Sequence, residues 1–277
     1  MNGPLGLNPE LLLAEWGRRV RANYEQAEQF REGVASNDFY APIAATFRAD
    51  PRRTNEPALD VLRGLVIPGE TWLDIGAGGG RYALPLAVAG ARVTAFDPSP
   101  GMLDVLRAAA AEFDVAGVTT ANGRWPTPEP FAADVALIAH VSYDIAEIGP
   151  FLDAMEATAS RMCVAVLLAE APATAAALFW PPVHGVERTL LPALPELLAL
   201  LLARGKTFSV WLGERAAPGY ESLEAIEGFA RQQLFIQAGG PKEAAMRDAI
   251  RERAVERDGR FYLSLQPSTL GVVTWKP

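Results

Sequence analysis

The chain has 277 residues, 50% of them apolar and 21% charged, which is enough to bury a sizeable core. Its formal net charge of −8 argues against nucleic-acid binding over the whole surface. A single cysteine, Cys163, excludes an internal disulfide. With only two histidines the chain has little to hold a metal, so we expect no metal site.

The N-terminus shows no basic region that leads into an apolar run, so no signal peptide is expected. The longest apolar stretch, 190–203, is interrupted by Pro192 and Pro195 and is too short to span a bilayer. The sequence therefore predicts a cytoplasmic protein without a membrane segment.

The first part of the chain is predicted to be helical. Asn8 and Pro9 offer a capping side chain followed by proline at the first helical position, and apolar residues then recur at helical spacing. Further helices are expected at 39–47 and 56–65. We expect residues 1–55 to form an N-terminal helical segment, and residues 56–277 to form the main domain, with an insertion around 171–192.

A buried strand and a glycine-rich turn follow. Residues 72–75 are apolar apart from Asp74, and residues 76–80 then contain four glycines, which allow a tight turn and the close approach of a ligand. A second strand, 91–96, ends on Asp97. In a parallel sheet the turn and Asp97 would lie past neighbouring strand ends, about 5 Å apart, where ligands bind. A carboxylate placed there can accept both hydroxyls of a ribose.

Strands and helices alternate through the rest of the chain, which predicts an α/β sheet. The expected strands are 118–121, 133–139, 162–168 and 206–212, and the expected helices are 101–113, 147–160, 194–203, 222–237 and 242–258. Segments 260–265 and 270–275 are expected to pair as a closing antiparallel hairpin.

The glycine-rich turn has two nucleoside-binding interpretations. A dinucleotide fingerprint that starts from Gly76 and Gly78 fails because its third position is Arg81. Starting from Gly78 and Gly80, that position is Ala83, which is tolerable. Asp74 argues against this interpretation, because such proteins usually keep an apolar residue at the strand end. A nicotinamide-dependent oxidoreductase is therefore the less favoured interpretation.

The spacing of Asp74, Gly76, Gly78 and Gly80 instead resembles motif I of the class I S-adenosylmethionine-dependent methyltransferases. Residues 96–103 resemble the acidic ribose loop of the same family. The resemblance covers roughly residues 60–168. It implies a Rossmann-like α/β fold, with a seven-stranded mostly parallel sheet, a C-terminal antiparallel strand and added N-terminal helices. Segments 124–126 and 139–144 also resemble a bacterial subgroup with no assigned substrate.

The resemblance implies S-adenosyl-L-methionine as the cofactor. The residues expected to contact it are Asp74, Gly76, Ala77, Gly78, Gly80, Asp97, Pro98, Met102, Trp125 and His140. Many family members have an acid for the adenine amino group where this chain has Arg124. Trp125 could stack on the adenine or belong to the core, and the sequence leaves both open. N-terminal additions in the family often form a lid, and packing on the sheet is the alternative.

Methyl transfer from a sulfonium requires mainly alignment, so few catalytic residues are expected. We expect catalytic roles for His140, a natural base near neutrality, and Tyr143, although a structural histidine is also possible. Substrate contacts are expected from Tyr40, Asp144, Trp180 and His184, with core packing as the alternative.

Together these features predict methyl transfer to a small molecule. A tRNA or protein acceptor, or a module that binds the cofactor without catalysis, are the alternatives. Nucleic-acid binding is not expected, and the oligomeric state stays open.

Overall fold

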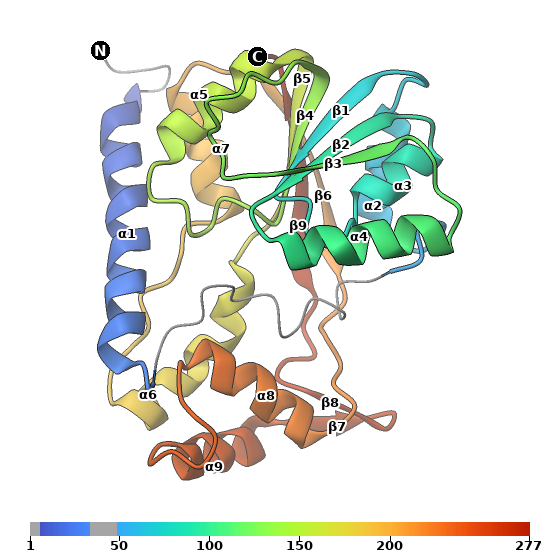
Figure 1. Ribbon diagram of the computed structural model, residues 1–277. Coiled ribbons are helices and arrows are strands. Elements are labelled where there is room, and N and C mark those ends of the chain that lie inside the picture. Colours follow the sequence, from blue (N-terminus) through green and yellow to red (C-terminus); the bar gives the residue numbers. More distant parts are fainter. Residues whose placement is uncertain (1–5, 34–48) are drawn as a thin grey trace.

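The computed structural model describes residues 6–33 and 49–277. The helix expected at 39–47, with Tyr40, lies outside the described residues. A seven-stranded sheet forms the centre of the molecule, and a smaller body lies beside one edge of this sheet (Figure 1). The strands are β1 (Thr71–Ile75), β2 (Arg92–Asp97), β3 (Val118–Asn122), β4 (Ala133–Ala139), β5 (Ala159–Leu168), β6 (Phe208–Arg215) and β9 (Ser268–Trp275).

The sheet has the order β3-β2-β1-β4-β5-β9-β6. The pairs from β3 to β5 are parallel, whereas β9 runs antiparallel to both β5 and β6. The carboxyl ends of β1, β2, β4, β5 and β6 and the start of β9 therefore meet at one edge. This arrangement confirms the predicted mostly parallel sheet with a C-terminal antiparallel strand.

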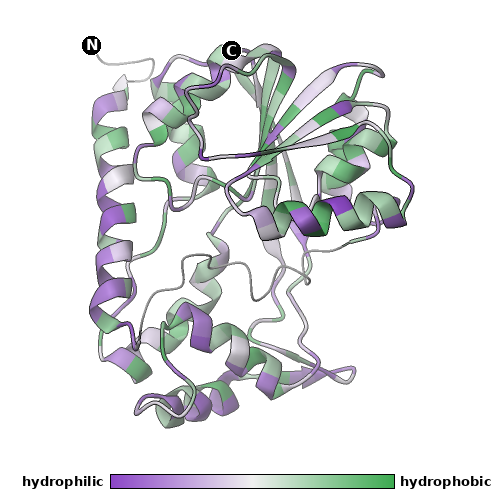
Figure 2. Cartoon of the chain, viewed as in Figure 1, coloured by the Kyte–Doolittle hydropathy of each residue, from purple (hydrophilic) through white to green (hydrophobic). Residues whose placement is uncertain are grey.

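Helices cover both faces of the sheet because successive strand residues face opposite sides. One face packs against α2 (Pro57–Leu65), α3 (Ala83–Val88) and α4 (Pro100–Glu112). The other packs against α1 (Pro9–Phe30), α5 (Ile148–Thr158) and α7 (Leu194–Ala203). Figure 2 shows the strands between these two helix layers as largely hydrophobic. No described helix has the length and apolar character needed to cross a membrane.

Helix α1 begins as the sequence predicts, because the Asn8 side chain accepts from the N–H groups of Glu10 and Leu11. The helix packs against α5 and α7, and the Trp16 indole donates to the carbonyl of Ile145 over 2.9 Å. These contacts anchor α1 beside the sheet. A lid role for the N-terminal segment stays a prediction.

The smaller body has its own hydrophobic core. It contains the 3₁₀ helix η3 (Pro172–Phe179), α6 (Trp180–His184), α8 (Leu223–Gln233), α9 (Glu243–Arg253) and a hairpin of β7 (Val255–Arg257) and β8 (Arg260–Tyr262). In Figure 1 these elements lie below the carboxyl edge of the sheet, and strands β6 and β9 lead from the sheet towards them.

The expected closing hairpin of 260–265 with 270–275 is wrong. Strand β8 pairs with β7, and β9 instead lies between β5 and β6. Asp258 and Gly259 form the two-residue turn between β7 and β8, with φ values of 52° and 72°. An Asp-Gly pair with positive φ at both residues is a preferred hairpin turn. The helix expected at 242–258 therefore ends at Arg253, and the residues that follow it form the hairpin.

Candidate active site

The glycine-rich turn is fixed to the end of β2 by backbone hydrogen bonds. The N–H groups of Gly76 and Ala77 both donate to the carbonyl of Phe96, over 2.7 and 3.1 Å. Gly78 donates its N–H to Oδ2 of Asp97, and Ser99 donates to Oδ1, each over 2.8 Å. The Asp97 carboxylate therefore points at the glycine turn, as the sequence predicts.

The glycines of this turn have different surroundings. Gly78 has a φ of +53°, and a Cβ built on it would meet no atom within 4 Å. At Gly80, with a φ of +83°, a Cβ would lie 2.8 Å from Cγ of Leu106. At Gly76 it would lie 2.4 Å from a methyl group of Val141. Gly76 and Gly80 therefore permit tight packing, whereas Gly78 borders open space beside Asp97.

Asp74 carries a buried oxygen that lacks a partner. Among the described residues no group donates a hydrogen bond to its Oδ1, although the N–H of Ala83 bonds to the carboxylate. Burial raises the pKa of Asp74 to about 7, and the negative charge of Asp97 adds to the effect. Buried polar atoms without a partner are uncommon in folded proteins. The side chain is therefore suited to accept a hydrogen bond from a bound group.

These features fit the cofactor that the sequence resemblance implies. A carboxylate offers about four acceptor sites, so Asp97 can accept from ribose hydroxyls as well as from the N–H groups of Gly78 and Ser99. Gly78 leaves room for a ligand against the backbone, and Asp74 offers an acceptor for a cationic or hydroxyl donor. The roles of the individual residues stay predictions.

The remaining predicted cofactor contacts lie around this turn or further out. Pro98 is exposed next to Asp97, and Met102 is buried in the first turn of α4. Trp125 packs edge-on against Phe96, with ring centroids 5.8 Å apart, and its indole donates to the carbonyl of Phe151. These contacts favour the core interpretation of Trp125.

At the end of β4, His140 and Ser142 both adopt positive φ, 57° and 89°. Such conformations are uncommon outside glycine, cost energy and cluster at functional sites. Nε2 of His140 lies 3.1 Å from the hydroxyl of Tyr82, and Nδ1 lies 3.4 Å from the hydroxyl of Tyr143. The backbone N–H of Leu168 donates to the Tyr143 hydroxyl over 2.8 Å. The structure thus brings together the two predicted catalytic residues and adds Tyr82.

Burial makes His140 a poorer base near neutrality than its residue type suggests, and its catalytic role stays a prediction. Burial lowers the pKa of His140 to about 3, and the positive charges of Arg215 and Arg81 act in the same direction. The imidazole is therefore uncharged at pH 7. One ring nitrogen then donates and the other accepts, which matches a hydroxyl partner on each side. His140 is a weak base suited to positioning.

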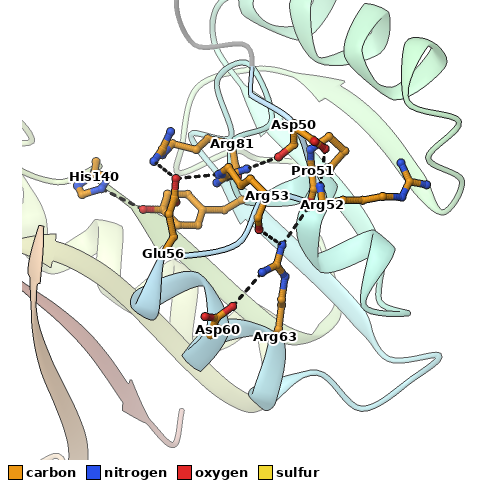
Figure 3. Close-up of polar contacts among 10 residues, drawn as sticks. Asp50, Pro51, Arg52, Arg53, Glu56, Asp60, Arg63, Arg81 and His140 are labelled. Carbon is orange, nitrogen blue, oxygen red and sulfur yellow. Dashed lines mark hydrogen bonds and ion pairs between the residues drawn. The ribbon is translucent and has the colours of Figure 1, made fainter. Parts of the chain in front are cut away.

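A network of charged groups beside His140 was missed by sequence reasoning. The Glu56 carboxylate accepts from Arg53 over 2.9 Å and from Arg81 over 2.8 Å, as Figure 3 shows. Burial acts to raise the pKa of Glu56, but the two arginines outweigh it and lower this pKa. Arg53 also donates to the carbonyl of Arg81 over 2.7 Å, so the network links the residue before α2 to the turn before α3. No motif marks these three residues, and only the fold brings them together.

A cavity of about 550 Å³ lies at the ends of β5, β6 and β9. Leu168, whose N–H reaches Tyr143, is one of its lining residues, so the cavity adjoins the His140 cluster. Its other walls come from η3, from Phe229 of α8 and from the segment after β8. Arg215 is also a lining residue, and its charge acts on both His140 and Tyr143.

The predicted substrate residues are divided between two places. Asp144 follows Tyr143 and has an exposed side chain, yet desolvation raises its pKa. Trp180 and His184 lie in the smaller body and do not line the cavity. Arg188 stacks on Trp180, and His184 contacts the carbonyl of Leu234 and the amine of Lys242. The structure therefore does not bring Trp180 and His184 to His140, and their substrate role stays a prediction.

Comparison with known proteins gives one family match. Residues 73–158 match the model of a methyltransferase domain, and this range runs from β1 to the end of α5. No curated protein matches the chain.

Many solved structures share the fold at low sequence identity. A putative methyltransferase from Bacillus halodurans C-125 is 15% identical, with a TM-score of 0.52 over 80% of this chain and 99% of its own. Magnesium protoporphyrin IX methyltransferase from Synechocystis PCC 6803, with bound S-adenosylhomocysteine, is 12% identical, with a TM-score of 0.51 over 98% of this chain and 100% of its own.

Coclaurine N-methyltransferase, bound to N-methylheliamine and S-adenosylhomocysteine, is 12% identical, with a TM-score of 0.50 over 97% of this chain and 93% of its own. At such identities the structural likeness shows the fold. The family match shows that residues 73–158 resemble a methyltransferase domain, and the structural likeness shows that the chain has the fold of these methyltransferases.

Proposed function

We propose that this protein transfers the methyl group of S-adenosylmethionine to a small molecule bound in the cavity beside His140. The observation that carries the proposal is the order of groups along the carboxyl edge of the sheet. Asp97 and the glycine turn follow β2 and β1, His140 follows β4, and the cavity begins at β5. Neighbouring strands lie about 4.8 Å apart, so a nucleoside at β1 and β2 would leave its amino-acid tail near β4.

When bound, the cofactor supplies a methyl carbon that is already activated for displacement. The residues of this chain then need to hold and align two ligands and keep water out. Asp97 and the backbone at Gly78 hold the nucleoside, and Asp74 accepts a hydrogen bond from the cofactor. The uncharged side chains of Tyr82, His140 and Tyr143 lie between the two sites. Each tyrosine hydroxyl contacts one nitrogen of the imidazole, which holds the three rings in place.

The small-molecule acceptor is supported by the size and walls of the cavity. A volume of about 550 Å³ lies within the range of small-molecule sites. Two of the structurally similar enzymes are named for small acceptors, a porphyrin and coclaurine. The net charge of −8 disfavours a tRNA acceptor.

The first experiment measures cofactor binding by calorimetry with S-adenosylmethionine, S-adenosylhomocysteine and NADH. We expect the first two to bind and NADH not to bind. Asp97→Ala should weaken both by about 1.5–3 kcal/mol, since it removes a charged hydrogen-bond acceptor. Equal affinity in the variant would remove Asp97 from the site, and preference for NADH would contradict the proposed cofactor.

The second experiment follows the labelled methyl group of S-adenosylmethionine. Small-molecule, tRNA and protein fractions are supplied separately as acceptors. Label in the small-molecule fraction is expected. Ala175 is exposed and lines the cavity, so Ala175→Trp should fill the cavity and abolish this labelling. The affinity for S-adenosylhomocysteine should stay unchanged, because the proposed cofactor site lies at the glycine turn. Label in tRNA or protein would favour those acceptors. No transfer despite tight cofactor binding would favour a non-catalytic module.

A further inference from the structure

Among the described residues that line the cavity, two are charged, Arg215 and Glu170, and the sheet places them in one row. Arg215, the last residue of β6, pairs with Ser268 at the start of β9. Ala169 donates its N–H to Thr269 of β9, so Glu170 lies level with Ser268. Residues level with one another on neighbouring strands project from the same face. Both charges therefore lie on the α2 side of the sheet edge, about two strand spacings apart.

Arg215 differs from the other arginines near His140. Arg53 and Arg81 are both bonded to Glu56. Within residues 6–33 and 49–277, by contrast, the Arg215 guanidinium makes no hydrogen bond or ion pair. Its charge nevertheless acts on His140, Tyr82 and Tyr143, where burial is the larger cause of the shifted pKa values. Among the described residues, Arg215 is thus a cavity-lining cation without a counter-ion, near enough for its charge to act on the pKa values of His140 and Tyr143.

The groups around His140 are poorly suited to remove a proton from an acceptor. The imidazole is uncharged and weakly basic, and burial raises the pKa of both Tyr82 and Tyr143, which keeps them protonated. A general base helps only when the acceptor arrives protonated. An acceptor that is already anionic at neutral pH needs no base, and it would be attracted by Arg215.

On the basis of the proposed function, we propose that the methyl acceptor is the carboxylate of an apolar small molecule, held by Arg215 in this cavity. A carboxylate is ionised at pH 7, and the planar guanidinium matches its two oxygens. The apolar part of the molecule would contact Leu178, Phe229 and Leu263. Glu170, in the same row, disfavours a second anionic group.

The reaction then balances without a proton transfer. One carboxylate oxygen forms a bond to the methyl carbon while the bond from that carbon to the sulfonium sulfur breaks. The sulfur keeps the electron pair of the broken bond. The products are a methyl ester and S-adenosylhomocysteine, and Arg215 keeps its charge throughout.

The test uses the full chain saturated with S-adenosylhomocysteine. Three acids of different shape are titrated by calorimetry: phenylacetate, indole-3-acetate and decanoate. The amines of matching shape, phenethylamine, tryptamine and decylamine, are titrated beside them. Arg215→Gln removes the charge, and Glu170→Gln is the matched control on the same row. Both side chains are exposed, so both variants should keep the fold, which circular dichroism checks.

At least one acid should bind the unaltered protein, and Arg215→Gln should weaken each acid that binds by about 10- to 100-fold. Glu170→Gln should leave acid binding unchanged or tighter, and the amines should bind more weakly than the acids. When S-adenosylmethionine is added in place of S-adenosylhomocysteine, mass spectrometry should detect the methyl ester of the bound acid.

Four results would overturn the inference: no acid binds at millimolar concentration, Arg215→Gln binds acids as well as the unaltered protein, the amines bind as tightly as the acids, or a bound acid gives no ester. Failure of the proposed function would give a different result, namely no binding of S-adenosylhomocysteine. The acids are therefore also titrated without S-adenosylhomocysteine, so that the effect of Arg215→Gln on acid binding can be measured in either case.

Discussion

The two ends of the carboxyl edge of the sheet differ in the groups that form them. At β1 and β2 the proposed binding groups are the glycine turn and the Asp97 carboxylate, which backbone N–H groups hold in place through hydrogen bonds of 2.7–3.1 Å. At β5, β9 and β6 the walls of the cavity are side chains, which come from η3, α8, the segment after β8 and the strand ends. The first region depends on a few neighbouring residues. The second depends on elements about 100 residues apart in the chain.

This difference matches the kind of ligand that each region has to bind. Backbone groups are set by the turn geometry and change little with the surrounding sequence, which suits a ligand of fixed structure. Side chains on connecting segments can be exchanged without disturbing the sheet, which suits a variable acceptor. The comparison therefore predicts that substitutions at the glycine turn act on cofactor binding and stability, and that substitutions at the cavity act on acceptor binding alone.

The prediction with the largest expected effect tests whether Gly80 serves packing and Gly78 serves ligand binding. Gly80→Ala places a methyl group 2.8 Å from Leu106 Cγ and 3.0 Å from Leu84 Cγ, at a φ of +83°. Overpacking and left-handed backbone strain should together lower the free energy of unfolding by about 2–5 kcal/mol. Chemical denaturation measures this change.

Gly78→Ala is the matched control, because its φ of +53° carries strain but its added methyl group meets no atom within 4 Å. Its free energy of unfolding should fall by only about 1–2 kcal/mol. Its affinity for S-adenosylhomocysteine should nevertheless fall, since the methyl group enters the space left for the ligand. Equal stability losses with unchanged affinity at both positions would contradict the division of tasks.

The second prediction concerns the proton on Asp74. Its pKa of about 7 in the folded protein lies above the value of roughly 3.9 for an exposed aspartate, so folding favours the protonated form. The resulting stabilisation is fully present below about pH 4 and is lost as the pH rises to about 7. Relative to Asp74→Asn, the free energy of unfolding should fall by at most about 1.4 kcal/mol per pH unit within this window.

Urea denaturation of both proteins at several pH values measures this difference, and parallel curves would contradict the raised pKa. Cofactor binding provides a second readout. If a cationic group of the ligand lies against Asp74, binding near pH 6 should release a proton, so the measured enthalpy should change with the ionisation heat of the buffer. A buffer-independent enthalpy would show that no cationic group of the ligand lies against Asp74.

The position of Asp97 against the glycine turn could be predicted from the sequence because its signals are local. The strand, the glycine turn and Asp97 lie within 27 residues, and Asp97 bonds to Gly78, a residue that the pattern singled out. The parallel sheet could also be predicted, since apolar strands that alternate with helices pair in parallel. Parallel pairing brings the carboxyl ends of the strands to one edge of the sheet. His140 was correctly placed at the end of β4, but its pKa could not be predicted, because burial and Arg215 act on it only in the folded chain.

The acceptor side could not be predicted, because its contacts join residues far apart in the chain. Arg215 comes near enough to act on His140 only once β9 has paired between β5 and β6, whereas the sequence predicts that the β9 segment pairs with residues 260–265. Glu56, Arg53 and Arg81 carry no motif, and the aromatic residues expected in the pocket, Trp180 and His184, pack instead within the smaller body. The role of such a charged residue can be inferred only when the fold shows which groups lie beside it.

The smallest expected effect concerns the side chains that lie between the two regions. Tyr143→Phe removes the hydroxyl that accepts from the Leu168 N–H over 2.8 Å and contacts His140, so a buried donor loses its partner. The free energy of unfolding should fall by about 1 kcal/mol, and acceptor binding should weaken because Leu168 lines the cavity. Tyr82→Phe is the control, because its hydroxyl lies 3.1 Å from Nε2 of His140, whereas the hydroxyl of Tyr143 bonds to the backbone of cavity-lining Leu168. It should cost less stability and leave acceptor binding unchanged. If both variants behaved alike in denaturation and in acid titration, Tyr143 would not couple the imidazole to the cavity, and the two regions would be independent.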